Sequence, residues 1–163
     1  MADYKEEIKK WFSLDHIETS EVKNNLADFQ LVLKNVFGLG FVINIAKPKD
    51  NSILQIVMEL ASPKVVQDGF ASLTAEEKLQ HIEELKMELL KIDVDYEISD
   101  NLDSVTLGNI VYLEDMTRTS FMKSLKSVRN AALVTISILS GKFNPGYEST
   151  PSHTHLDISS PYG

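Results

Sequence analysis

Two histidines near the end of the chain are the residues whose spacing comes closest to a metal site. His153 and His155 are separated by one residue, and two imidazoles at this spacing could hold one metal ion between them. The chain has no cysteine, which excludes a thiolate ligand, a disulfide and a cysteine nucleophile. Two ligands alone bind metal ions weakly and with little selectivity. We therefore predict neither a structural metal nor a cofactor.

Acidic residues alternate with apolar ones between residues 93 and 98. Asp93, Asp95 and Glu97 superficially resemble a calcium-binding loop, but Ile98 stands where that loop needs a glycine. An alternation of period two is typical of a strand with one face in water. We interpret these carboxylates as the solvated face of a strand.

Other candidate catalytic or binding residues are isolated. Gly38 and Gly40 form a GxG pair, but a dinucleotide site needs a third glycine and a following helix, whereas a strand pattern follows here. His16 and His81 have no nucleophile or carboxylate at a recognisable spacing. The sequence therefore assigns no catalytic residue.

The composition is that of an ordinary globular protein. With 163 residues, of which 43% are hydrophobic and 25% charged, the chain can bury a core in one domain. A net charge of −8 disfavours binding to nucleic acid or anionic lipid. The most apolar segment, residues 131–139, is about half the length that crosses a bilayer, and the charged N-terminal residues do not resemble a signal peptide. We expect a cytoplasmic protein that binds neither nucleic acid nor membranes.

Hydrophobic periodicity predicts an α+β fold with the order α-β-β-β-α-β-β-α. Apolar alternation indicates strands at 27–35, 41–47, 52–60, 93–98 and 104–113, with a candidate sixth edge strand around 17–22. Period-3.6 patterns indicate helices that begin at Asp3, at the capping box of Thr74 and Glu77, and between residues 117 and 120. We expect a twisted antiparallel sheet with its helices mainly on one face.

The glycines and prolines predict where elements end. Gly69 is expected to end a short helical piece that begins at Pro63, and Gly141 to end the last helix. The second main helix is expected to bury Ala75, Leu79, Ile82 and Leu89 and to stop near Ile92. From residue 143 the apolar content is too low to offset ordering entropy. We therefore predict one domain over residues 1–142 and a disordered tail over 143–163.

Three segments carry a resemblance to a known family. Val94–Ile98, Ser120–Met122 and Val128–Leu133 resemble an uncharacterised archaeal protein family of the secretion-chaperone-like fold. The resemblance covers about residues 4–140 and leaves out the tail. Because that family has no assigned reaction, the resemblance implies a fold and transfers no catalytic residue.

Charge is distributed unevenly along the chain. Residues 76–115 hold twelve acids and three lysines, whereas residues 116–147 hold no acid. The cations of the second stretch are Arg118, Lys123, Lys126, Arg129 and Lys142. This basic helix is either neutralised by its acidic neighbours or forms a docking surface for an acidic protein segment. A third alternative for this helix is association with nucleic acid, which the negative net charge of the chain disfavours.

The last predicted helix has apolar residues on two sides. Its main stripe, expected to face the sheet, consists of Phe121, Leu125, Val128, Ala132, Ile136 and Leu139. Ala131, Val134 and Ile138 lie well around the helix from that stripe. We predict that they form the contact of a self-complementary dimer, with Lys123 and Lys126 at its rim.

Two functions remain open on the sequence. The first is a non-enzymatic protein-binding module, an adaptor or chaperone-like factor that acts as a homodimer. The alternative is a small-molecule-binding protein or an unassigned enzyme, with a pocket between sheet and helices where Tyr96, Tyr112 and His81 converge with acids. A deep pocket with convergent polar groups would favour the alternative.

Overall fold

The computed structural model describes residues 3–34, 36 and 41–143. Its elements are α1 (Tyr4–Leu14), β1 (Thr19–Glu21), β2 (Ala27–Lys34), β3 (Val42–Pro48), β4 (Ile53–Ala61), α2 (Lys64–Ala71), α3 (Ala75–Leu89), β5 (Asp95–Ile98), β6 (Ser104–Tyr112), a 3₁₀ turn (Leu113–Asp115) and α4 (Arg118–Phe143). The predictions for residues 144–163, for His153 and His155, and for the pair Gly38 and Gly40 lie outside the described residues.

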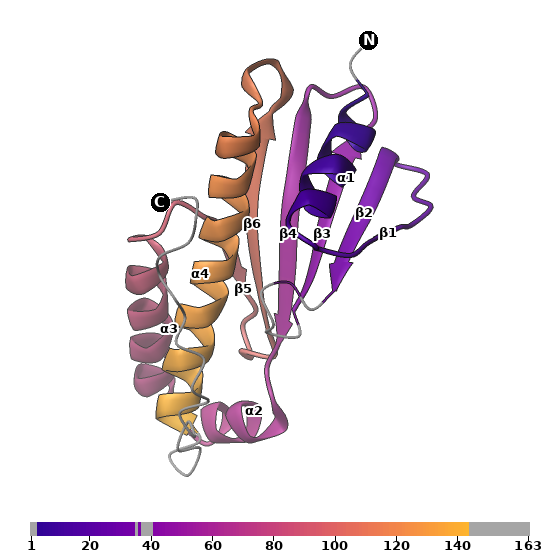
Figure 1. Ribbon diagram of the computed structural model, residues 1–163. Coiled ribbons are helices and arrows are strands. Elements are labelled where there is room, and N and C mark those ends of the chain that lie inside the picture. Colours follow the sequence, from indigo (N-terminus) through magenta and orange to yellow (C-terminus); the bar gives the residue numbers. More distant parts are fainter. Residues whose placement is uncertain (1–2, 35, 37–40, 144–163) are drawn as a thin grey trace.

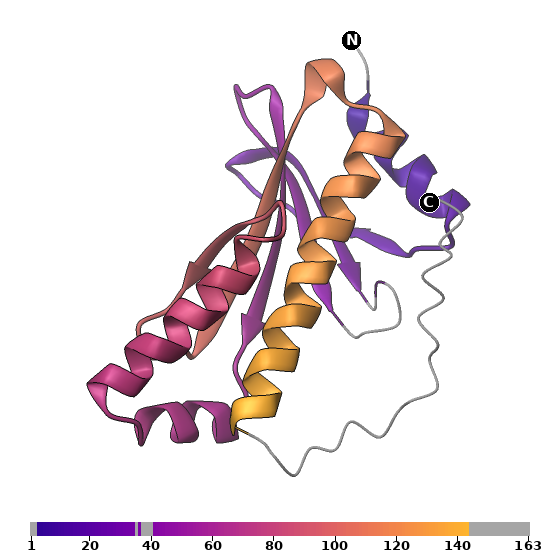
Figure 2. The ribbon, with the colours of Figure 1, turned by 90° about the vertical axis from the view of Figure 1, so that its left-hand side faces the viewer.

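The strands form one antiparallel sheet in the order β1-β2-β3-β4-β6-β5. The predicted α+β class is thus confirmed, and the candidate edge strand is the sixth strand. Helices α1, α3 and α4 lie on one face of the sheet, and α2 lies across one end (Figures 1 and 2). Both edge strands are short, with three residues in β1 and four in β5, which limits edge-to-edge pairing with other chains.

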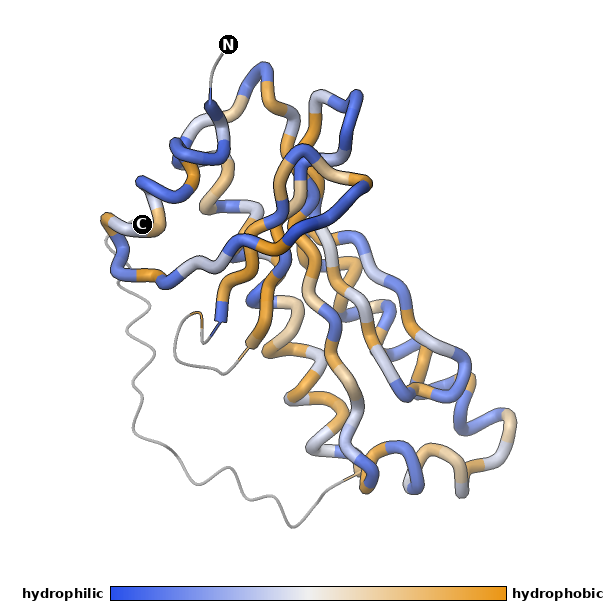
Figure 3. The backbone as a smooth tube through the Cα atoms, turned by 90° about the vertical axis from the view of Figure 1, so that its right-hand side faces the viewer, coloured by the Kyte–Doolittle hydropathy of each residue, from blue (hydrophilic) through white to orange (hydrophobic). Residues whose placement is uncertain are grey.

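The core lies between the sheet and its helices. In β4, Leu54, Ile56 and Met58 are fully buried, while the alternate residues Gln55 and Glu59 are exposed. Figure 3, which views the molecule from the side opposite to Figure 2, shows the strands changing between orange and blue along their length. The period-two pattern of the sequence therefore assigns one face of each central strand to the core.

The helix starts follow the predicted caps. The Asp3 side chain accepts a hydrogen bond from the Glu6 main-chain N–H, and both bonds of the capping box between Thr74 and Glu77 are formed. The Glu77 carboxylate accepts hydrogen bonds from the main-chain N–H and from the hydroxyl of Thr74. Both bonds lower the pKa of Glu77, and the main-chain bond has the larger effect.

No described helix is long and apolar enough to cross a membrane.

The predicted helix ends at the two glycines are wrong. α2 continues through Gly69, and α4 continues through Gly141 to Phe143. The Phe143 ring packs edge-on against Phe70 of α2, with ring centres 6.2 Å apart, and against His81 of α3, at 5.4 Å. These contacts offset the helix propensity that each glycine lacks, about 1 kcal/mol. α4 thus ends in a junction with the two neighbouring helices.

The predicted buried stripe of α3 also needs correction. Leu79 is 61% exposed, whereas Leu85 and Leu89 are buried. α3 lies beside the second half of α4 in both views of the ribbon (Figures 1 and 2). Of the predicted stripe, Leu89 is buried and Ile82 is half-buried against the core, whereas Ala75 and Leu79 are exposed and Leu85 is buried instead. The helix also ends at Leu89 rather than near Ile92.

Substituting the two glycines tests this helix junction. A Cβ at Gly141 would meet nothing within 4 Å, so Gly141→Ala should raise the free energy of unfolding by about 0.5–1 kcal/mol. A Cβ at Gly69 would come within 2.8 Å of Phe143 Cδ1, so Gly69→Ala should lose this gain by displacing the ring. Urea unfolding of both variants measures the difference. Equal stabilisation by both would show that Phe143 does not pack on α2.

Candidate functional site

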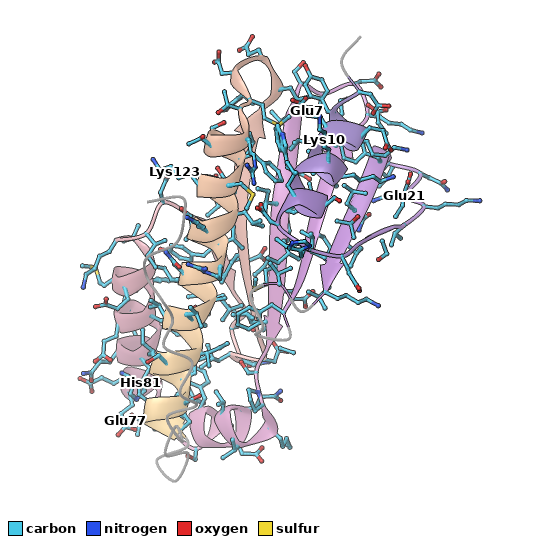
Figure 4. The ribbon with its side chains drawn as sticks, viewed as in Figure 1. Glu7, Lys10, Glu21, Glu77, His81 and Lys123 are labelled. Atoms are coloured by element: carbon cyan, nitrogen blue, oxygen red, sulfur yellow. The ribbon has the colours of Figure 1, made fainter. Side chains whose placement is uncertain are left out.

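The predicted dimer surface is only partly accessible. Ala131 is 0% exposed because α3 packs along this side of α4, so its prediction as an outer-face residue is wrong. Ile138 is half-buried against the core and lines a groove between α3 and α4. Val134 is half-buried and Lys123 is exposed on the outer side of α4 (Figure 4). Sequence reasoning overlooked α3 as a cover for α4.

Ile136 is predicted to be buried, and this prediction is wrong. The sequence places Ile136 in the stripe that faces the sheet, but the residue is 40% exposed. Thr135, one position earlier, is buried instead, and its hydroxyl donates to the Ala131 carbonyl oxygen at 2.8 Å. This satisfied hydroxyl allows a polar side chain to lie in the core, which apolar periodicity cannot predict.

Two cations of α4 pair with acids of other elements. Arg118 Nη2 lies 2.7 Å from Asp15 Oδ1, at the end of α1, and Lys142 pairs with Glu84 of α3. Burial lowers the pKa of the Arg129 guanidinium. The paired cations support neutralisation by acidic neighbours, one of the two interpretations of this basic helix.

His81 belongs to the junction of α2, α3 and α4 (Figure 4). Its Nδ1 lies 2.8 Å from Lys142 Nζ. Because an ammonium group only donates, Nδ1 accepts this bond, and the ring proton lies on Nε2 when the bond is made. Burial, and then the charge of Lys142, lowers the pKa of His81, while Glu77 raises it. These contacts explain His81 as a residue of the junction between the helices.

The acidic residues of β5 face outward, as predicted. Asp95 and Glu97 are exposed, and the alternate residues Tyr96 and Ile98 pack against the core. In the part of the chain that the structure describes, no three His, Asp or Glu side chains gather closely enough to hold a metal ion.

A pocket of about 280 Å³ lies between the sheet, α2 and the last turns of α4. Its apolar walls include Leu60 at the end of β4, Val66 of α2, Val105 of β6 and Leu139 of α4. All but Leu60 are buried, so the walls are held in place by the core. The pocket is preformed by segments far apart in the sequence.

The described lining of the pocket has hydroxyl groups but no charged side chain. Among the described lining residues only Ser62, Thr135 and Ser140 are polar, and none is ionisable. Ile136 also lines the pocket, and its partial exposure places it at the rim. Phe41, just before β3, contributes an aromatic wall. Such a lining can bind an uncharged apolar group, and its described residues offer no side chain for acid–base chemistry at neutral pH.

The residues expected to converge in a pocket do not do so. Tyr112 lies on the exposed face of the sheet, Tyr96 lies in the edge strand β5, and His81 lies at the helix junction. None of them lines this pocket. The alternative prediction is right that a pocket lies between sheet and helices, but it is wrong about the lining.

Comparison with known proteins gives the family and the fold. Residues 4–139 match the family described as "Uncharacterized conserved protein (DUF2299)", which confirms the resemblance to an uncharacterised family. The crystal structure of an uncharacterized protein from Methanothermobacter thermautotrophicus superposes with a TM-score of 0.78. It is 22% identical, and the match covers 85% of this chain and 98% of that chain. The similarity shows a shared fold with an archaeal protein.

A second solved structure is more distant. The crystal structure of YbjN from E. coli superposes with a TM-score of 0.48 and 10% identity, and the match covers 84% of this chain and 90% of that chain. No curated protein matches the chain significantly.

The homodimer stays a prediction, and Val134, which is half-buried on α4, is the position that tests it. Val134→Asp should convert a dimer into a monomer, because an unpaired charge in a desolvated contact costs several kcal/mol. Light scattering of wild type and variant measures the change, and Val42→Asp, at an exposed apolar position on the sheet, is the control. A wild-type monomer at high concentration contradicts the prediction.

Acidification tests the His81 contact. The folded pKa of His81 lies below its ordinary value of 6.5, so the unfolded chain takes up a proton at higher pH than the folded chain. Stability should therefore fall as the pH drops from about 6.5 through the folded pKa. We expect this loss in wild type relative to His81→Gln, measured by urea unfolding between pH 8 and 5. If the free energy of unfolding depends on pH in the same way for wild type and His81→Gln, His81 does not form this contact.

Proposed function

This chain belongs to the DUF2299 family of uncharacterized conserved proteins, and we propose that it is a non-enzymatic protein-binding module. In this proposal the pocket between α4, α2 and the end of β4 receives one uncharged apolar side chain of a partner protein. The partner is held as by an adaptor or chaperone-like factor, and it is not chemically changed.

The observation that carries the proposal is the lining of the pocket. General acid–base or nucleophilic catalysis needs a titratable side chain or an activated nucleophile within reach of the substrate. Ser62, Thr135 and Ser140 supply hydroxyls, and the lining that the structure describes places no histidine, lysine or carboxylate beside them. Burying a charged ligand here would leave it without a counter-ion, which is costly. The pocket is suited to neutral apolar groups.

The size of the pocket supports a single anchoring side chain. A cavity of about 150 Å³ takes benzene, and ligand pockets usually range from about 300 to 1,000 Å³. At about 280 Å³ the pocket suits one large side chain and is too small for an extended nucleotide cofactor. Interfaces commonly gain much of their affinity from one such anchor in a preformed pocket.

Exposed apolar surface at the rim supports an occupant that is part of a larger molecule. The Ile136 side chain both lines the pocket and remains 40% exposed. It therefore extends apolar surface from the pocket onto the outside of α4. A main chain that carries the anchor can cover this surface, whereas a free ligand enclosed in the pocket would leave it in water. The predicted homodimer would present two such pockets and could join two partners.

Charge at the rim tests the proposal. Peptides are selected from a random display library against the full chain, and their dissociation constants are measured for wild type and Ile136→Asp. We expect selected peptides to share one large apolar residue and to bind Ile136→Asp at least about tenfold more weakly, because the new carboxylate borders the anchor.

Ile110→Asp is the matched control. Ile110 is 42% exposed, nearly as much as Ile136, but it belongs to β6 and lies on the face of the sheet away from the helices. This variant should bind the peptides as wild type does. The proposal is contradicted if the peptides bind Ile110→Asp more weakly than wild type and bind Ile136→Asp as tightly as wild type.

A further inference from the structure

We infer that the group this pocket recognises is a bicyclic aromatic ring with a single N–H donor, the chemistry of an indole. The inference rests on the proposed function, and it specifies which side chain of the partner protein occupies the pocket. It follows from the hydrogen-bonding state of two hydroxyls in the lining, from the absence of charge among the described lining residues, and from the volume of the pocket.

Ser62 presents an unpaired hydroxyl to the pocket. The residue is only 8% exposed, and its main-chain groups are paired elsewhere: its N–H donates to the Asp103 carbonyl oxygen, and its carbonyl oxygen accepts from Gln67 Nε2, both at 2.8 Å. Within the described chain its hydroxyl forms no hydrogen bond, and its oxygen is not sealed off from open space. Since Ser62 lines the pocket, we assign this unpaired hydroxyl to its interior. An occupant that covers this hydroxyl without bonding to it would leave a buried polar group unsatisfied, so an occupant with a hydrogen-bonding group is favoured.

Thr135 indicates that the occupant donates the hydrogen bond and the pocket accepts it. Its hydroxyl proton is already donated to the Ala131 carbonyl oxygen, at 2.8 Å, so the oxygen can only accept a further bond. Ser62 can either accept or donate. An occupant with a donor is therefore compatible with both hydroxyls, whereas an occupant with only an acceptor is compatible with one.

The remaining constraints narrow the choice of donor. An ammonium or guanidinium donor is charged, and the described lining residues include no carboxylate to pair with it. A small alcohol would leave much of the apolar wall unfilled, with loss of packing. The pocket has about twice the volume of a cavity that takes one benzene ring, which suits two fused rings. A tryptophan side chain meets the requirements of size, neutrality and a single N–H donor.

The first experiment separates the hydrogen bond from apolar burial. Indole and benzothiophene have similar shapes, but only indole has an N–H donor. Their dissociation constants for the full chain are measured by NMR titration for wild type, Ser62→Ala and the control Ser127→Ala, a half-buried serine of α4 that is not among the lining residues. We expect wild type to bind indole about two- to tenfold more tightly, which corresponds to one net hydrogen bond. Ser62→Ala should reduce this preference, and Ser127→Ala should retain it.

Each result bears on a different claim. Equal binding of the two rings to wild type, or a preference that Ser62→Ala leaves unchanged, overturns the inference and leaves the proposed apolar pocket intact. Failure of both rings to bind, or binding that Ile136→Asp leaves unchanged, contradicts the proposed pocket as well.

A peptide probe distinguishes a protein side chain from a free ring compound. The blocked pentapeptide Gly-Gly-Trp-Gly-Gly should bind at least as tightly as indole, because its main chain can cover the apolar rim near Ile136. It should also displace indole. Binding of indole with exclusion of the peptide would support recognition of the ring but overturn the tryptophan of a partner as its source.

Discussion

The packing of α4 on β4 and β6 is the interaction on which the rest of the structure depends. With 26 residues, α4 is about 39 Å long, whereas the nine-residue strands beneath it span about 30 Å. The helix is therefore long enough to hold other elements at both ends. Near its start, Phe121 packs against Trp11 and Phe12 of α1, with ring centres 5.5 and 5.7 Å away, and at its end Phe143 packs against α2 and α3. One helix thus fixes the positions of the other three.

The pocket follows from the same arrangement. Sheets twist while a helix stays nearly straight, so the two separate toward the end of their contact. Here the separation comes where β4 ends and the chain turns into α2, so Leu60 and Val66 face Leu139 across open space. Since Val66 and Leu139 are buried, closing this space would require repacking of the core. The proposed binding function uses this space directly, whereas acid–base catalysis would need titratable groups, which are absent from the described lining residues.

Local sequence patterns predicted the elements well and their mutual packing poorly. The alternation in β4 and the capping box at Thr74 are determined by neighbouring residues, and both were predicted correctly. The exposure of Ile136 and the burial of Ala131 depend on which side of α4 receives α3, and periodicity along one helix does not contain that information. The pocket was predicted only as a location between sheet and helices, because its lining combines residue 41 with residues 60–66, 105 and 135–140.

The central claim is that this preformed pocket binds uncharged apolar groups. A crystallographic soak of the full chain with small fragments tests it most directly, using matched sets of neutral, anionic and cationic aromatic compounds. The account predicts electron density for neutral aromatic fragments between Leu60 and Leu139, and none for charged fragments of the same size. A pocket that stays empty with every neutral fragment, or that takes up carboxylates in preference to them, would contradict it.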